Sequence, residues 1–172
     1  MKNKALVVLF LTIFLDLMGF GLIIPILPIY AKTLGATDAM VGLLGASFSI
    51  MQFIFASFWG GLSDRYGRRP IMLISISIMI VAYILFANAT VLWLLFATRL
   101  LKGFGAANLS VAQAYISDVV PVEKRTKAFG IIGAAFGLGF IFGPSIGGIV
   151  NEFYGVSGVG YFAAALGALN LV

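Results

Sequence analysis

The sequence predicts an all-α membrane protein that crosses a lipid bilayer several times. Hydrophobic residues make up 62% of the chain, and its mean hydropathy is +1.12, whereas a soluble domain is roughly 45–50% apolar. Apolar runs of about twenty residues, enough to span roughly 30 Å of hydrocarbon as a helix, alternate with short polar stretches. Lys and Arg gather in every second polar stretch. These three observations predict a bundle of transmembrane helices.

The first helix is expected at residues 5–30. Its basic start and apolar continuation imitate a signal peptide, but the apolar run passes through Pro25 without a clear cleavage site, so we expect it to be retained. The sixth run has no polar end before the last residue and is expected to be an incomplete helix. The remaining helices are predicted at residues 39–62, 70–88, 91–117 and 127–150, with the incomplete one at 157–172.

The basic residues predict the orientation of the helices. If the helices alternate in direction, Lys32 is the one basic loop residue on its side of the membrane. Lys and Arg accumulate in cytoplasmic loops, so the amino terminus is expected in the cytoplasm. The opposing set consists of Lys2, Lys4, Arg65, Arg68, Arg69, Lys124, Arg125 and Lys127.

Composition also excludes several classes of function. The chain contains no cysteine and no histidine, which removes disulfides and the commonest metal ligands. No group of serines and carboxylates forms a recognisable catalytic arrangement, so we predict neither an enzyme nor a metal or cofactor site. The net charge of +5 is concentrated in loops between apolar runs, which argues for orientation in a membrane and against a nucleic-acid partner.

The stretch GGLSDRYGRRP, between the second and third helices, is the most charged segment of the chain. Asp64 ends a helix, where a carboxylate faces the negative end of the helix dipole and favours a cationic partner. Arg68 is the nearest candidate, and Asp118 at the end of the fourth helix offers the same guanidinium a second carboxylate. The alternative is that these charges only set orientation. The pattern as a whole comprises Gly60, Asp64, Arg65, Gly67, Arg68 and Arg69.

Three ionisable residues fall inside the predicted membrane spans. Asp16 and Arg99 lie at about the same depth if each residue rises about 1.5 Å, and Lys102 lies one turn nearer the cytoplasm. An isolated charge there costs at least about 2.5–3.5 kcal/mol, so we expect Asp16 and Arg99 to pair, with Lys102 as a competing partner. A purely structural ion pair is the alternative interpretation.

The fourth helix is predicted to carry a polar stripe that faces a cavity. At about 100° per residue, five of its polar residues fall within an arc of about 80°. Asn108 falls on the opposite face. Gln52 of the second helix is a weaker candidate for the cavity and is more typical of an interhelical hydrogen bond. The stripe consists of Arg99, Lys102, Ser110, Gln113 and Ser117.

The fifth helix has a face of small residues. Ala135, Gly139, Gly143 and Gly147 recur every four residues, which lets another helix approach closely. Pro144 removes a backbone donor and bends the helix. This face is either a simple packing seam or a seal against the other half of a transporter.

Four stretches together resemble the major facilitator superfamily, in particular its drug/proton antiporters of the tetracycline and multidrug efflux type. They are the charged loop above, LFATRLLKGFGAA with Arg99, LDLMGFGLIIPILP in the first helix, and GFIFGPSIGG. The last is similar to the antiporter motif at Gly139, Gly143, Pro144, Gly147 and Gly148.

The resemblance implies the amino-terminal six-helix bundle of that fold, built of two three-helix inverted repeats. It also implies a secondary active transporter that exports a small amphiphilic drug-like compound in exchange for protons, and so contributes to antibiotic resistance. The implied location is a bacterial inner membrane, and the implied partners are the bilayer, protons, a small-molecule substrate and a missing carboxyl-terminal six-helix half. Asp16 is the expected proton-linked or substrate-contacting acid, with Arg99 stabilising its charged form, and the charged loop is the expected cytoplasmic gate.

Two features depart from the family pattern. Lys102 stands where the fourth-helix motif usually has glutamine, and the third helix lacks the acid that tetracycline exporters carry there. Three alternatives remain. The chain could belong to an uptake or metabolite transporter of the same fold, it could be a membrane scaffold without transport, or it could be a truncated half-transporter that is inactive alone.

Overall fold

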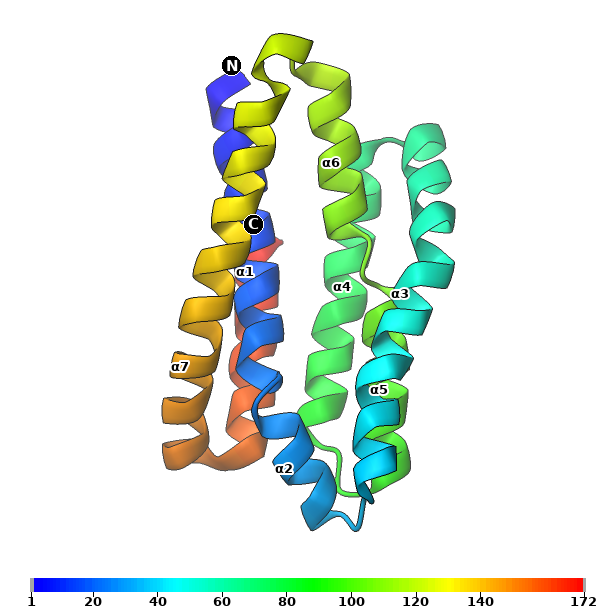
Figure 1. Cartoon of the computed structure of the whole chain (residues 1–172), viewed down its shortest axis with the longest axis vertical. Coiled ribbons are helices and arrows are strands. Elements are labelled where there is room, and N and C mark those ends of the chain that lie inside the picture. Colours follow the sequence, from blue (N-terminus) through cyan, green and yellow to red (C-terminus); the bar gives the residue numbers. More distant parts are fainter. Residues whose placement is uncertain (1, 172) are drawn as a thin grey trace.

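The structure is a computed structural model that describes the backbone of residues 2–171 and the side chains of residues 6–171. Within these residues all regular structure is helical, and the helices form an elongated bundle in which most neighbours run antiparallel (Figure 1). The predicted helical fold is therefore confirmed. The helices are α1 (Lys2–Ile23), α2 (Ile26–Thr33), α3 (Asp38–Tyr66), α4 (Arg68–Ala87), α5 (Leu92–Phe104), α6 (Asn108–Val119) and α7 (Val122–Asn170).

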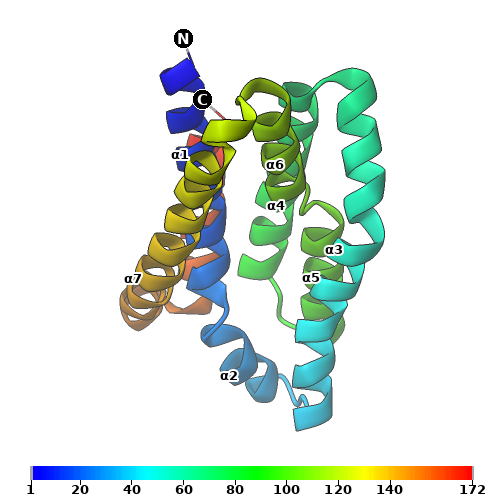
Figure 2. The same ribbon diagram turned by 45° about the horizontal axis from the view of Figure 1, so that its top comes forward.

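Among the described residues, four helical stretches are long and apolar enough to cross a membrane: Leu6–Thr33, Asp38–Tyr66, Arg68–Ala87 and Val122–Asn170. α5 and α6 continue one another in the same direction and together run alongside α4 (Figure 1). The amino terminus, the α3–α4 connection and the α6–α7 connection lie at the same end of the bundle (Figures 1 and 2). The bundle therefore separates these basic segments from Lys32 in α2, as the sequence predicts.

The helix expected at residues 5–30 is interrupted, and it forms α1 and α2. The break falls at Ile24 and Pro25, and Pro25 precedes the first residue of α2 with φ −72°. Proline has no backbone N–H and cannot continue the hydrogen-bond ladder of α1. Proline at a helix start is favourable because its φ suits the first turn. The apolar pattern hides this break, since both segments are hydrophobic.

The helix expected at residues 91–117 is also divided, into α5 and α6. The intervening backbone is bonded by neighbouring helices: the indole N–H of Trp59 donates to the Phe104 carbonyl at 2.5 Å, and the Ser75 hydroxyl donates to the Gly105 carbonyl. Ser75 also accepts from the Ala107 N–H at 3.3 Å. Backbone groups at membrane depth must be satisfied inside the protein, and these side chains meet that requirement.

The two helices expected at 127–150 and 157–172 form the single element α7, which folds back on itself. Gly155 has a non-helical φ of 67° and ψ of −175°, a backbone region that side-chain-bearing residues avoid. The chain reverses there, so residues 122–154 and 156–170 form two legs that lie side by side (Figure 1). α7 also begins earlier than expected, at Val122, because Pro121 immediately precedes its first turn.

The small face of α7 packs against α1. A Cβ added at Gly139 would lie 2.8 Å from Leu17, one at Gly143 would lie 2.8 Å from the Cα of Gly21, and one at Gly147 would lie 2.5 Å from the Leu22 carbonyl oxygen. These distances mean that the two backbones approach each other through glycine. The small face of α7 therefore packs against α1 of the same chain. Gly148, in contrast, faces open space.

We predict opposite effects for two adjacent glycines of α7. Gly147→Ala forces a methyl group against the α1 backbone and should lower the stability of the chain by about 1–3 kcal/mol. Gly148→Ala, which meets no atom within 4 Å, should leave stability unchanged or raise it by up to about 1 kcal/mol, because alanine is the better helix former. Thermal unfolding of the purified variants in detergent measures both. Equal melting temperatures would contradict the close contact of α1 and α7.

Candidate functional site

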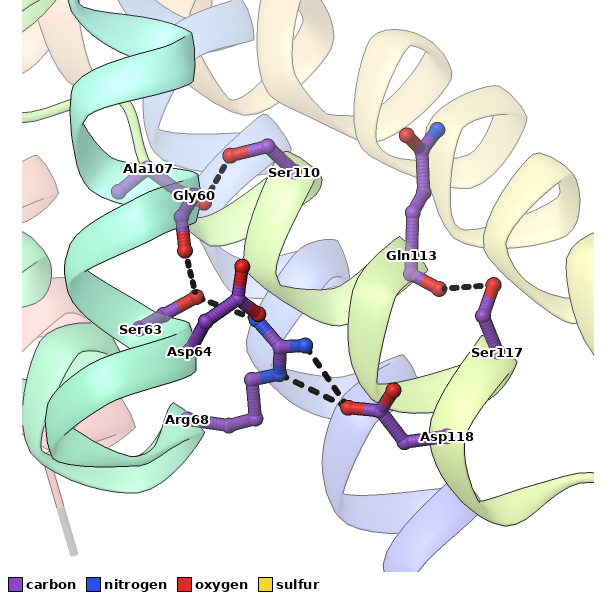
Figure 3. A network of polar contacts seen from close by, with 9 residues as sticks. All are labelled: Gly60, Ser63, Asp64, Arg68, Ala107, Ser110, Gln113, Ser117 and Asp118. Atoms are coloured by element: carbon purple, nitrogen blue, oxygen red, sulfur yellow. Dashed lines mark hydrogen bonds and ion pairs between the residues drawn. The ribbon is translucent and has the colours of Figure 1, made fainter.

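A cluster of charges joins α3, α4 and α6 at the end of the bundle that holds the amino terminus (Figure 3). The Arg68 guanidinium lies 2.6 Å from an Asp64 carboxylate oxygen and 2.8 Å from one of Asp118. A second bond runs from Arg68 Nε to the same Asp118 oxygen at 3.0 Å, and Nη1 donates to the Ser63 hydroxyl at 2.5 Å. Both ion pairs that the sequence predicts are present.

The other residues of the charged loop lie around this cluster. Gly67 has φ 94°, a value suited to glycine, and it turns the chain directly from α3 into α4. The Gly60 carbonyl accepts from the Ser63 hydroxyl at 2.8 Å, which orients Ser63 towards Arg68. Arg65 and Arg69 are exposed. The loop therefore contributes one arginine to the network and presents the other two to the surroundings.

A second polar site lies in the middle of the bundle, around Asp16 of α1. The Asn108 amide donates to the Asp16 carboxylate at 3.4 Å, while the other polar atom of that side chain, Oδ1, is buried and has no partner among the described residues. Asp16 faces a cavity of about 230 Å³. The cavity is lined by Ile13, Asp16, Leu17, Phe20, Phe48, Gln52, Met79, Lys102, Ala106, Leu109, Phe136 and Phe140.

Arg99 is buried, with 5% of its surface exposed, but it does not pair with Asp16. The ion pairs within the described chain involve only Lys32, Arg68 and their carboxylates. The Arg99 guanidinium carbon instead lies 5.5 Å from the ring centre of Phe20 and 5.2 Å from that of Phe48. The predicted Asp16–Arg99 pair is therefore wrong for this structure, because aromatic rings occupy the position that we assigned to the carboxylate.

Lys102 of α5 lines the same cavity as Asp16. Its ammonium donates to the Tyr83 hydroxyl at 2.5 Å and lies 4.6 Å from the ring centre of Phe20. Lys102 is only 3% exposed, so protein groups surround it in place of water.

The rest of the predicted polar stripe is not in the cavity. Ser110 donates to its own helix at the Ala107 carbonyl, 2.9 Å away, and Gln113 is exposed with its side chain directed away from the Arg68 cluster (Figure 3). Gln52, the weaker candidate, lines the cavity. The predicted stripe assumes a rotation of about 100° per residue along one continuous helix. The helix is interrupted between Phe104 and Asn108, so residues on the two sides of the break do not share one face.

Sequence reasoning missed two members of this site, Asn108 and Tyr83. The helical projection places Asn108 opposite the polar stripe because it assumes a continuous helix. The signal available in the sequence is GFGAAN, since two glycines shortly before a buried asparagine favour a break. Tyr83 lies among apolar residues in the second half of α4 and gives no such signal.

The arrangement places an acid and a cation at one cavity, since both Asp16 and Lys102 line it. Among the residues that the structure describes, no group of His, Cys, Asp and Glu is placed to hold a metal ion. The cavity walls are mainly aromatic and aliphatic, which suits an amphiphilic molecule with one polar end.

Comparison with known proteins gives consistent matches across the chain. The profile of the Major Facilitator Superfamily matches residues 9–172. The class C tetracycline resistance protein of Escherichia coli is 38% identical over 174 residues, covering 99% of this chain and 44% of that protein. The quinolone resistance protein NorA of Staphylococcus aureus (strain MRSA252) is 37% identical over 171 residues, covering 99% of this chain and 44% of that protein.

A solved structure has the same fold. The crystal structure of the human organic anion transporter MFSD10 (TETRAN) superposes with a TM-score of 0.88 at 27% sequence identity, covering 99% of this chain and 46% of the other. The chain therefore spans less than half the length of the curated relatives and of the solved structure that it matches.

We predict that Arg68 and Asp118 are energetically coupled. Arg68→Gln and Asp118→Asn should each destabilise the chain, and the double variant should be more stable than the sum of the two losses implies, by at least about 0.5 kcal/mol, as is usual for contacting residues. Thermal unfolding in detergent gives this double-mutant cycle.

Arg69→Gln is the matched control, because Arg69 is adjacent and exposed. Its effect should stay within about 0.5 kcal/mol and should add to that of Asp118→Asn. Strict additivity of Arg68→Gln with Asp118→Asn would show that the ion pair contributes nothing measurable.

Proposed function

Because the chain belongs to the Major Facilitator Superfamily, we propose that it forms the amino-terminal half of a secondary transporter that exports a small amphiphilic compound in exchange for protons. The observation that carries this proposal is Asp16, a carboxylate placed at a cavity between membrane-spanning helices with Lys102 opposite. Charged groups inside a membrane are costly and generally mark substrate or ion pathways. The chain supplies about half of such a protein, since this fold binds substrate between two six-helix halves.

Asp16 is suited to carry the transported proton. It is the one carboxylate of the chain that is not exposed; the others are Asp38, Asp64, Asp118, Glu123 and Glu152. Protonation removes the negative charge that Asp16 presents to the cavity lined by Lys102 and leaves a group that can still bond to Asn108. The balance of charge in the cavity therefore changes with each proton, which gives the two states of a proton-driven cycle different preferences for substrate.

The Arg68 cluster is suited to act as a gate. Its ion pairs hold the ends of α3, α4 and α6 together, which favours one conformation of the cytoplasmic side. An alternating-access cycle requires the halves to rock about the central site. We propose that this cluster forms in the state closed to the cytoplasm and separates in the other. The glycines and Pro144 of α7 support the rocking by keeping α1 and α7 a single rigid unit.

The direction of transport and the kind of compound are taken from the relatives. Resistance proteins for tetracycline and for quinolones are both similar to this chain, which supports drug export and a bacterial inner membrane as the location. α4 contains no acidic residue, whereas tetracycline exporters carry one in this helix. The proposal therefore does not name tetracycline as the substrate. The other proposed partners are the bilayer, protons and a carboxyl-terminal six-helix half.

We predict that Asp16→Asn in the full-length protein abolishes substrate export driven by an imposed pH gradient. The amide keeps the size and hydrogen bonding of the side chain but cannot exchange a proton at these pH values. Dye efflux from everted membrane vesicles measures the effect. Asp38→Asn is the control, because Asp38 is exposed and paired with Lys32 on the surface, and it should retain export. Full gradient-driven export by Asp16→Asn would remove Asp16 from the mechanism.

A separate prediction concerns orientation. Since the natural sequence has no cysteine, single cysteines at Lys32 and Arg69 can be labelled individually. A membrane-impermeant maleimide added to intact cells should label the cysteine at 32 and leave the one at 69 unlabelled until the membrane is opened. Labelling of both from the same side would overturn the proposed topology.

A further inference from the structure

The membrane interior of this chain contains more positive than negative charge. Arg99 and Lys102 are both buried, with 5% and 3% of their surfaces exposed. Asp16 is the single carboxylate near them, because the chain's other five Asp and Glu side chains are exposed at helix ends and loops. The site therefore has one cation more than it has anions when all three groups are ionised.

Asp16 does not neutralise either cation through a direct ion pair within the described residues. Its carboxylate accepts a hydrogen bond from the Asn108 amide at 3.4 Å. Arg99 lies against the rings of Phe20 and Phe48, and its Nε is buried without a hydrogen-bond partner. Ring faces attract cations, but they supply no negative charge. An anionic partner is therefore missing from the chain's own side chains.

Lys102 lies at the cavity, where an anionic partner would contact its ammonium group. The Tyr83 hydroxyl fixes one of its ammonium donors, and the rings of Phe20 and Tyr83 lie 4.6 and 4.1 Å from the nitrogen. An ammonium group has three donors, so further donors remain for another acceptor. Lys102 also lines the cavity of about 230 Å³ together with Phe136 and Phe140. Lys102 therefore borders the cavity, with 3% of its surface exposed.

We propose that Lys102, supported by Arg99, makes this cavity the binding site for the anionic end of the substrate, so that the transporter prefers aromatic compounds bearing a carboxylate over cationic ones. This inference rests on the proposed function, since it names the class of compound that the transporter carries. Cation–carboxylate hydrogen bonds are about twice as strong as neutral ones, and the rings around Lys102 provide an apolar surface for an aromatic body.

The competing explanation is that a carboxylate from the second half of the transporter neutralises Lys102. In that case Lys102 has no role in choosing the substrate. Lys102→Gln would then leave the second half's carboxylate without its partner, and removing one member of a buried pair is strongly destabilising. Transport of every substrate would fall together. The two explanations therefore differ in selectivity.

The test uses the full-length transporter in proteoliposomes with an imposed pH gradient. Carboxyfluorescein and rhodamine 6G are suitable probes because both contain a xanthene ring system but the former is anionic and the latter cationic. The wild-type protein should transport carboxyfluorescein faster than rhodamine 6G. In Lys102→Gln the ratio of the two rates should fall at least about tenfold, which corresponds to about 1.4 kcal/mol of discrimination, and Lys102→Arg should restore most of it.

Lys32→Gln is the matched control, since Lys32 is an exposed lysine paired at the surface, and it should leave the ratio unchanged.

A wild-type preference for rhodamine 6G, or a ratio that Lys102→Gln does not alter, would overturn the inference while leaving the transporter proposal intact. Equal loss of both rates in Lys102→Gln would also overturn it and favour a carboxylate from the second half. Transport of neither probe by the wild-type protein would count against both this inference and the proposed function. If Lys102→Gln fails to fold, the wild-type ratio and Lys102→Arg still decide the question.

Discussion

The absence of water from the bilayer interior is the constraint on which the rest of this structure depends. Backbone groups there must be satisfied by the protein, yet the chain breaks its fourth crossing between α5 and α6. Ser75 of α4 and Trp59 of α3 bond to the backbone at the break. The break therefore costs few unpaired groups, and it turns α6 so that Asn108 meets Asp16. The polar site is thus a consequence of how an interrupted helix is supported.

The same constraint explains the surroundings of the charged side chains. Phe20 lies beside both cations of α5, so aromatic faces take over part of the role that water has outside the membrane. The Arg68 cluster at the end of the bundle follows a different rule, because its carboxylates are more than half exposed while Arg68 is 16% exposed. Direct ion pairs occur at the rim of the bundle, whereas the interior relies on rings, hydroxyl groups and a single amide. This difference is consistent with the proposed gate at the Arg68 cluster and the proposed binding site around Asp16.

Much of the fold and part of the site could be predicted from the sequence. The helical membrane bundle follows from apolar run length, the Arg68 ion pairs from the spacing of Asp64, Arg68 and Asp118, and the close helix contact from glycines every four residues. The partner of Asp16 could not be obtained in the same way, since a helical projection assumes a continuous helix and the chain breaks just before Asn108. Aromatic rings beside Arg99 come from three-dimensional packing between α1, α3 and α5, which leaves no periodic signal in the sequence.

The break between α5 and α6 turns Asn108, and not the predicted stripe, towards Asp16. Chemical cross-linking tests this arrangement most directly, because the chain contains no cysteine. Cysteine pairs at positions 16 and 108, and at positions 16 and 113, are treated in membranes with a short bifunctional thiol reagent, and mobility on a denaturing gel is measured. We expect rapid cross-linking of the 16–108 pair and none of the 16–113 pair. Rapid cross-linking of 16–113 with none of 16–108 would mean that the helix is continuous and that Asn108 does not face Asp16.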